Sequence, residues 1–380
     1  MNSEQTYFAL LRAALWNTSD EALKDISLTS EVFTIAQQQG TAALVYDRIL
    51  SLPQAQRPDA QTQALMKQVC ARTMLHQEHM LDYLRRAQKA LDVPTIKPVL
   101  LKGFSLARLY PKPYLRQCGD IDIFVGKEAY HKGAKLLREA FPEAALFDEE
   151  KDYYKHYNLT FESTAIEMHR VSVSFAHPRD VRLYDRLEHE AMFVSPRTIT
   201  TEHGTWLEPE ERFNVLFVFI HSWEHLLSET VSFRQLCDLA LAIHNVQDKE
   251  ELARYLHRNL KTLRLLRAWQ LYAYILVHYL GVPAEQMPLY TPHCKRRAEH
   301  LLAIILDPKG RAEHIEANKQ RNSNVPKNIV LRKLFTFRCR LREAREIAKI
   351  EPQYARHTIT TSIAQSFIRF LHGENTRTWE

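Results

Sequence analysis

The chain has 380 residues, which is enough for two or three packed units. Apolar residues make up 45% of it and charged residues 25%, and this balance excludes fibrous and wholly disordered architectures. Only 9 residues are glycine, and none of them lies in a G-x-G-x-x-G or G-x-x-x-x-G-K-[ST] motif. The sequence therefore argues against Rossmann dinucleotide binding and against P-loop chemistry.

The net charge of +6 is concentrated at the C-terminal end of the chain. Residues 295–380 contain 18 Lys and Arg against 9 Asp and Glu, so this segment carries +9 and the first 294 residues carry −3. The basic run has two open interpretations, a solvated helix face or a surface for the phosphate backbone of RNA. The positions concerned are Arg332, Lys333, Arg338, Arg340, Arg342 and Arg345.

The cysteines and the N-terminal segment bear on the cellular compartment. The five cysteines are widely spaced and form no C-x-x-C pair, which indicates reduced thiols rather than a zinc or redox site. Residues 1–16 lack the pattern of a secretory signal, and no run of 18 apolar residues occurs. We therefore expect a cytoplasmic protein without a membrane partner.

Helical periodicity dominates both ends of the chain. Apolar residues recur at helical spacing over residues 5–92, and one long helix is predicted over residues 61–91. Helical periodicity returns near residue 208 and continues to the end, with interruptions predicted over residues 283–292 and 307–328.

Between these helical blocks, short apolar or alternating segments predict strands. The predicted strands cover residues 98–101, 120–125, 157–162 and 164–173. The predicted intervening helices cover residues 104–110 and 128–140. We therefore expect an α+β fold, a small mixed sheet flanked by N-terminal and C-terminal helical regions. The expected regions are residues 1–95, 96–205 and 206–380.

Asp120 and Asp122 are two carboxylates separated by one residue on a predicted strand. Because side chains alternate along a strand, both point to the same face of the sheet. Two like charges do not suit an apolar core, but they make a good oxygen site for Mg²⁺ or Mn²⁺ together with substrate phosphates. A D-x-D pair alone is a weak signal, so the surrounding sequence decides its interpretation.

Two further segments place phosphate-binding and acidic groups near this pair. Upstream, a predicted strand leads into Lys102, Gly103 and Ser105 at the start of a helix, where backbone N–H groups and a lysine favour phosphate. Downstream, Glu167 is a third carboxylate, flanked by apolar residues on another predicted strand. Three carboxylates beside a phosphate-binding turn are what two-metal phosphoryl transfer requires.

The order of these motifs resembles that of the polymerase-β-like nucleotidyltransferase superfamily, and in particular a largely uncharacterised bacterial nucleotidyltransferase family. The resemblance covers about residues 7–245, and the basic C-terminal end is matched poorly. The motifs that carry it are Lys102-Gly103, Tyr110-Pro111, Arg116, Gly119-Asp120-Ile121-Asp122, Glu167-x-His169, His221, His225 and Asp238. At one point the chain departs from the superfamily pattern, because Phe104 separates Gly103 from Ser105 where many members have a Gly-Ser pair.

The resemblance implies a nucleotidyltransferase core over residues 96–205 and a metal-dependent reaction. The catalytic and metal-binding residues that it implies are Asp120, Asp122 and Glu167. The residues that it implies in nucleotide binding are Lys102, Gly103, Ser105 and Arg116. For Arg116, an ordinary surface charge is the alternative. The expected ligands are Mg²⁺ or Mn²⁺ and an NTP, with ATP as the default.

His221 and His225 lie four residues apart on a predicted helix and so share a face. They do not form the H-E-x-x-H motif of zinc hydrolases, because Ser222 occupies the position of the general base. Two interpretations of these histidines stay open, together with Arg234 and Asp238. They contact the nucleotide or acceptor in a cleft, or they form a polar network that ties the helical region to the sheet.

His169 shares the strand face of Glu167. It is either a partner of the metal-binding carboxylates in the cleft or a core histidine with its own hydrogen bonds.

The expected activity is transfer of a nucleoside monophosphate from an NTP to a hydroxyl, with Glu167 as the general base. The alternative is a non-catalytic nucleotide- or RNA-binding regulator on the same fold. The three carboxylates favour catalysis. The acceptor stays open between a tRNA end, a protein hydroxyl and a small molecule, and the basic C-terminal region tilts the choice towards RNA.

Overall fold

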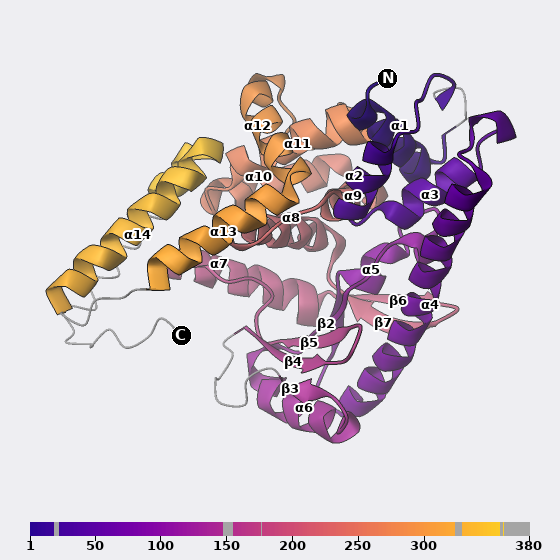
Figure 1. Cartoon of the computed structure of the whole chain (residues 1–380). Coiled ribbons are helices and arrows are strands. Elements are labelled where there is room, and N and C mark those ends of the chain that lie inside the picture. The colour runs from indigo at the N-terminus through magenta and orange to yellow at the C-terminus, as the bar shows by residue number, and fades with distance from the viewer. Residues whose placement is uncertain (19–22, 147–154, 176, 324–328, 358–359, 361–380) are drawn as a thin grey trace.

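The computed structural model describes residues 1–18, 23–146, 155–175, 177–323, 329–357 and 360. Its centre is a seven-stranded mixed sheet with the strand order β3-β4-β5-β2-β1-β7-β6 (Figure 1). The strands are β1 (Val99–Leu101), β2 (Asp120–Phe124), β3 (Ala145–Leu146), β4 (His156–Thr160), β5 (Ala165–His169), β6 (Arg197–Thr201) and β7 (Gly204–Glu208). Strand β2 is antiparallel to β1 and parallel to β5, so the mixed sheet of the predicted α+β fold is confirmed.

The sequence predicts four of these strands and misses three. The predicted strand over residues 164–173 is shorter than expected, because β5 ends at His169. Strand β3 has only two residues, too few for a periodic signal. Strands β6 and β7 form a hairpin at the edge of the sheet, closed by Glu202 and His203, and most of the hairpin is half-buried or exposed. Its threonine-rich sequence therefore lacks the apolar run by which the other strands are predicted.

The N-terminal segment folds into helices, and polar side chains cap the first turns of three of them, α1, α2 and α4. The helices are α1 (Ser3–Trp16), α2 (Ser30–Gln38), α3 (Ala42–Leu50), the short η2 (Gln54–Gln56) and α4 (Ala60–Leu91). Asn2 and Gln5 form a capping box at α1, and Asp59 caps α4 by accepting from the N–H of Thr62. Helix α4 confirms the long helix predicted over residues 61–91, and it runs along one side of the molecule in Figure 1.

The other helices lie between the strands and in the C-terminal part of the chain. Those between or directly after strands are α5 (Gly103–Ala107), η3 (Pro113–Leu115), α6 (Gly126–Ala140), α7 (Pro178–His189) and the π-helical turn η4 (Glu190–Val194). Those that follow the sheet are α8 (Glu211–Ser228), α9 (Phe233–Asn245), α10 (Lys249–Thr262), α11 (Leu266–Leu280), η5 (Pro292–Cys294), α12 (Lys295–Leu306), α13 (Pro308–Ser323) and α14 (Ile329–Ile350).

Two helix predictions differ from the structure. Helix α5 ends at Ala107, whereas the sequence predicts a helix as far as residue 110. The predicted interruption over residues 307–328 is wrong for residues 308–323, which form α13. This helix begins at Pro308, and proline is tolerated in the first turn because its missing N–H would have no partner there. Among the described residues, no helix is both long enough and apolar enough to span a membrane.

The two faces of the sheet differ in chemistry. Leu100, Ile121, Ile123, Ile166 and Met168 belong to an apolar cluster with α4 and α6. Because side chains alternate along a strand, the residues between them point to the opposite face, and these include the carboxylates of β2 and β5. The acidic positions thus lie on the face away from α4 and α6.

A second and larger apolar cluster unites the two ends of the chain. It contains Leu10 of α1 and Val45 of α3 together with Phe219 of α8, Leu239 of α9 and Trp269 of α11, all almost fully buried. The helical segments before and after the sheet therefore share one core. The division at residues 95 and 205 stays a prediction.

Candidate active site

The carboxylates of β2 and β5 are direct neighbours in the register of the sheet. Asp122 pairs with Leu101 of β1 on one side and with Glu167 of β5 on the other, and Glu167 pairs in turn with Asn158 of β4. Residues directly opposite each other on adjacent strands have their side chains on the same face, within contact distance. One row across four strands therefore carries an amide and two carboxylates.

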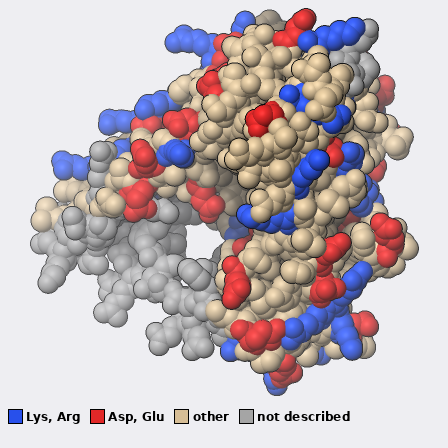
Figure 2. Space-filling model, turned by 45° about the vertical axis from the view of Figure 1, so that its right-hand side comes forward, with Lys and Arg blue, Asp and Glu red and all other residues tan. Residues whose placement is uncertain are grey.

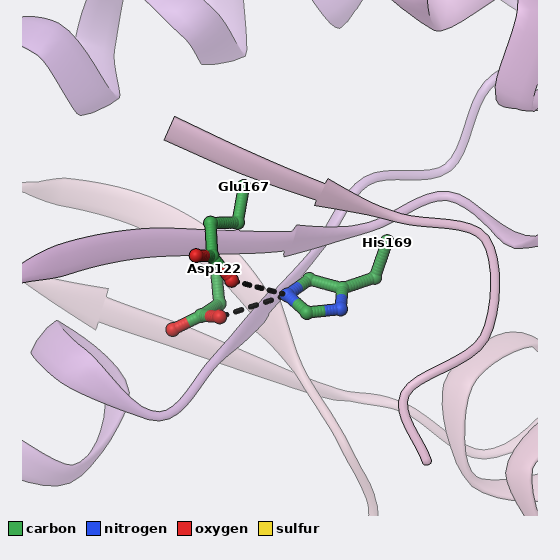
Figure 3. A group of neighbouring side chains, drawn as sticks. All are labelled: Asp122, Glu167 and His169. Atoms are coloured by element: carbon green, nitrogen blue, oxygen red, sulfur yellow. Dashed lines mark hydrogen bonds and ion pairs between the residues drawn. The ribbon is translucent and has the colours of Figure 1, made fainter. Parts of the chain in front are cut away.

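Asp122, Glu167 and His169 form a compact group that could hold a metal ion (Figure 3). One ligand atom from each of these side chains lies within 4.8 Å of the others. His169 Nε2 lies 2.8 Å from Asp122 Oδ1 and 3.6 Å from Glu167 Oε2. Asp120 is not a member of this group, although its charge raises the pKa of both Lys102 and Glu167 and so acts from close by.

One oxygen of Asp122 indicates that this group of side chains can hold a cation. The side chain is fully buried, and its Oδ2 makes no hydrogen bond within the described structure. A buried carboxylate oxygen without a donor is costly unless a cation completes its environment. Carboxylate oxygens suit Mg²⁺ and Mn²⁺, so the residues present fit such an ion. His169 donates to Oδ1 and thereby orients the carboxylate with Oδ2 available.

Lys102 lies at the edge of this group. Its Nζ is 2.9 Å from Asp122 Oδ1 and 2.9 Å from His221 Nε2, and its side chain is 12% exposed. Burial alone would lower the pKa of Lys102, but the negative charges of Asp122, Asp120 and Glu167 outweigh burial and raise it. The lysine is therefore a charged ammonium in contact with the acidic group.

The backbone at Lys102 and Gly103 is unusual. Both residues have positive φ, 38° at Lys102 and 41° at Gly103. A side chain at Gly103 would bring a Cβ atom to 3.3 Å from the carbonyl oxygen of Asp120. Lysine pays a steric penalty in this conformation that glycine does not, and strained backbone of this kind clusters at functional sites. The turn holds the start of α5 close against the first residue of β2.

The pKa values of the two neighbouring carboxyl groups, Asp122 and Glu167, are shifted in opposite directions. Burial alone would raise the pKa of Asp122, but the Lys102 charge and the His169 hydrogen bond hold it below its usual range. Burial and the neighbouring Asp122 charge raise the pKa of Glu167 to about 8, against the opposing effect of Lys102. Without a bound cation, the acidic group is thus not fully ionised at neutral pH.

The two histidines of α8 extend the polar contacts beyond Lys102. His225 Nε2 lies 3.0 Å from His221 Nε2, and His225 Nδ1 lies 2.8 Å from Glu229 Oε2. Burial and then the Lys102 charge lower the pKa of His221 well below its usual value, so the neutral ring accepts a hydrogen bond from the lysine. The contact with Lys102 links α8 to the end of β1 beside the acidic group, and a role of these histidines in binding the nucleotide or acceptor stays a prediction.

Arg116 has a different set of partners from the one expected. Its Nε and Nη2 donate to the two carboxylate oxygens of Asp238, and the Tyr110 hydroxyl also donates to Asp238. Arg234 donates to the backbone carbonyl of Gln117. These residues therefore form the polar network between α9 and the segment before β2, and the phosphate contact expected for Arg116 is not supported.

Ser105 also differs from the expectation of a hydroxyl at a helix start. It is the third residue of α5, which has only five residues, and its side chain is completely buried. Its Oγ has no hydrogen-bond partner in the described structure. A buried hydroxyl without a partner keeps a role in ligand binding open.

Three residues near the acidic group were not singled out from the sequence. Asn158 adjoins Glu167 in the register, and its buried Oδ1 has no hydrogen-bond partner among the described residues. Lys155 binds Glu224 of α8 with an Nζ–Oε2 distance of 2.9 Å, and Glu224 also accepts from the N–H of Ser174. No motif marks these positions. Only the alternation of β4 would have assigned Asn158 to the face of Glu167.

The sheet, with a D-x-D strand beside a parallel strand that carries a third carboxylate and a Lys-Gly turn at the adjacent strand end, defines a protein of the nucleotidyltransferase class. The chain belongs to a family described as uncharacterised nucleotidyltransferase, whose model matches residues 28–281. This range contains every residue of the site described above. Membership of the predicted family is thereby confirmed.

Comparison with individual proteins gives one weak structural similarity and no match among curated sequences. A solved structure of an antigenic nucleotidyltransferase-like protein from Paracoccidioides brasiliensis is similar over 48% of this chain and 87% of its own, with 13% sequence identity and a TM-score of 0.29. No similar sequence was found among curated proteins.

Proposed function

We propose that the chain transfers a nucleoside monophosphate from an NTP to a hydroxyl acceptor and releases pyrophosphate. The observation that carries this proposal is the side-by-side register of Asp122 and Glu167, with a buried Asp122 oxygen that lacks a donor. Lys102 beside them supplies a positive charge for the triphosphate. Membership of a nucleotidyltransferase family supports the same class of reaction.

Each residue of the site has a role in this reaction. Asp122 and Glu167, with Asp120 on the same strand face, hold Mg²⁺ or Mn²⁺, and His169 fixes the orientation of Asp122. Lys102 and the backbone N–H of Gly103 bind the triphosphate. The cation, when bound, neutralises phosphate charge and makes the acceptor hydroxyl more acidic.

In the bond-making step the acceptor oxygen attacks the α-phosphorus of the NTP. The bond from that oxygen to the α-phosphorus forms as the bond from the α-phosphorus to the bridging oxygen of pyrophosphate breaks. Glu167 accepts the proton of the acceptor hydroxyl on a carboxylate oxygen. Binding both substrates in line supplies much of the rate, because it removes the entropic cost of their encounter.

RNA is the acceptor class that the charge distribution favours. The described side chains of α14 include Arg338 and Arg345, both exposed, whereas the side chains of Arg332 and Lys333 lie outside the described residues. Helices α13 and α14 extend from the body of the molecule in Figure 1. On the face of the body shown in Figure 2, basic and acidic side chains are interspersed. The basic helix α14 is therefore the better candidate surface for a polyanion.

The experiment that tests the proposed function uses the full chain with each of the four NTPs, labelled at the α-phosphate. The protein is incubated with Mg²⁺ or Mn²⁺ and with tRNA, with casein, or with no added acceptor, and pyrophosphate release and mass increments are measured. We expect one acceptor to gain the mass of a nucleoside monophosphate. Asp122→Asn is expected to abolish both signals.

The same experiment separates catalysis from the alternative, a nucleotide- or RNA-binding regulator on the same fold. A regulator binds an NTP, seen as a rise in melting temperature, without releasing pyrophosphate under any condition. That result would contradict the proposed enzyme.

A further inference from the structure

The Lys102 ammonium lies where its positive charge would repel a divalent cation that enters the acidic group. It lies at hydrogen-bond distance from Asp122, the residue whose other oxygen lacks a donor, and the charge of Asp120 also acts on it. Its side chain is almost buried, so little water screens the repulsion between the ammonium and an incoming cation. The resting site thus already contains a positive charge.

The backbone keeps this lysine in place. The positive φ of Lys102 and of Gly103, and the close approach of Gly103 to the Asp120 carbonyl, fix the Lys102 Cα beside β2. Only side-chain rotation can move the ammonium away from Asp122. His221 Nε2 offers a second partner, 2.9 Å from Nζ, at the side of the site formed by α8.

We propose that Lys102 is the resting counter-ion of the acidic group, so that the divalent cation binds with the nucleotide and not before it. This inference rests on the proposed function, because it needs a triphosphate as the ligand that draws Lys102 from Asp122. The triphosphate offers the ammonium new oxygen partners, and His221 keeps the lysine at the rim. Binding of nucleotide and binding of cation are therefore positively coupled through one side chain.

The inference predicts a result that a simple phosphate-binding role does not. A lysine that only binds phosphate has no effect on the affinity for the metal alone. A resting counter-ion suppresses that affinity, so its removal should strengthen metal binding while weakening nucleotide binding. The two roles differ in the sign of one measurement.

The test is the affinity of the full chain for Mn²⁺ alone, measured by electron paramagnetic resonance of the free ion. We expect weak binding by wild type and at least tenfold tighter binding by Lys102→Met. Lys102→Gln is the second variant, because its amide can still donate to Asp122 Oδ1 and so protects the fold. Lys155→Met is the matched control, since Lys155 is a nearby lysine paired with Glu224 rather than Asp122, and we expect a much smaller change.

A second arm measures Mn²⁺ binding in the presence of a nucleotide analogue. Addition of α,β-methylene-ATP should tighten Mn²⁺ binding by wild type beyond the chelation measured without protein, and it should tighten binding by Lys102→Gln much less. Asp122→Asn should lose the Mn²⁺ site in both arms.

The outcomes separate this inference from the proposed function. Mn²⁺ binding that depends on Asp122 but is equally tight in wild type and in both Lys102 variants overturns the counter-ion role alone. Absence of any Mn²⁺ binding that depends on Asp122, with and without the nucleotide analogue, overturns the proposed metal-dependent reaction as well.

Discussion

Arg116 Nε and Nη2 lie 2.8 Å and 2.7 Å from the two carboxylate oxygens of Asp238, and both side chains are buried. This bidentate pair joins the segment before β2 to helix α9 of the C-terminal region. The pair therefore anchors strand β2, which carries Asp120 and Asp122, to helix α9 of the larger apolar cluster.

Removal of one member of this pair should be costly. Arg116→Met leaves the Asp238 carboxylate buried without its cation, which we expect to lower the free energy of unfolding by about 3–5 kcal/mol. Tyr110→Phe removes one hydrogen bond to the same carboxylate and should cost about 1 kcal/mol. Urea unfolding checks both values. If Arg116→Met unfolds like wild type but loses NTP binding, the phosphate role expected from the sequence would be right after all.

Replacement of Asp120 and of Asp122 by alanine should affect the stability of the protein differently, but both replacements should abolish ligand binding at the acidic group. Asp122→Ala leaves Lys102 buried without its partner and should destabilise the metal-free protein by roughly 3–5 kcal/mol. Asp120 is half-buried and has no ion pair among the described residues, so Asp120→Ala should change stability by less than about 1 kcal/mol.

Thermal melts in EDTA compare the stabilities of these two variants, and melts with Mg²⁺ and α,β-methylene-ATP compare their ligand binding. The ligands should raise the melting temperature of wild type and leave both variants unchanged. A large ligand-induced rise in either variant would remove that carboxylate from the metal site.

Glu188, which lies outside the acidic group, should make the free energy of unfolding depend on pH. Burial raises the pKa of Glu188 to about 7, although hydrogen bonds from Ser172 oppose the shift. The folded protein therefore keeps a proton that the unfolded chain loses near pH 4.3, so the free energy of unfolding falls as pH rises from about 4.5 to 7. The total contribution is at most about 4 kcal/mol.

Urea unfolding between pH 5 and pH 8 checks the role of Glu188. Glu188→Gln should become progressively more stable than wild type up to pH 7, and the difference should then level off. Glu128→Gln, which changes an exposed carboxylate of α6, should follow wild type at every pH. A constant difference between Glu188→Gln and wild type would show that Glu188 does not titrate in this range.

RNA binding by the basic helix should depend steeply on salt. Each phosphate neutralised contributes roughly 0.7–0.9 to the slope of log affinity against log salt. Replacement of Arg338, Arg340 and Arg342 with glutamine should flatten the slope measured with tRNA by about 2 units and leave the affinity for NTP unchanged.

A matched triple replacement on α4 is the control for this measurement, and the exposed residues to replace with glutamine are Lys67, Arg72 and Lys89. This variant should keep the wild-type slope. No tRNA binding by wild type at low salt would exclude the RNA surface and favour a protein or small-molecule acceptor.

The sequence predicts the parts of the site that depend on local pattern. The alternation of β2 correctly assigns Asp120 and Asp122 to one face, and the two strands that flank it bring Lys102 and Glu167 beside them. His169 joins the group because it lies two residues beyond Glu167 on the same face. These relations need only the period of a strand and the order of the strands.

The sequence does not predict the partners that come from distant segments. Arg116 and Asp238 are separated by more than a hundred residues, and nothing local distinguishes a buried ion pair from two surface charges. The contact of Lys102 with His221 has the same origin, since it depends on how α8 crosses the end of β1. The role of a charged residue follows from its burial, and burial is decided by the whole fold.

The shared core of the two helical regions has a consequence for how the chain acquires its structure. Trp16 Nε1 donates to the carbonyl of Leu280, and Gln39 Nε2 donates to the carbonyl of Ile305. During synthesis the first three helices leave the ribosome long before the C-terminal helices are made. Until then their apolar faces stay exposed to solvent or bound by chaperones. Contacts this distant along the chain also make folding slow. Premature termination anywhere within the sheet would therefore yield an aggregating fragment rather than a smaller folded protein.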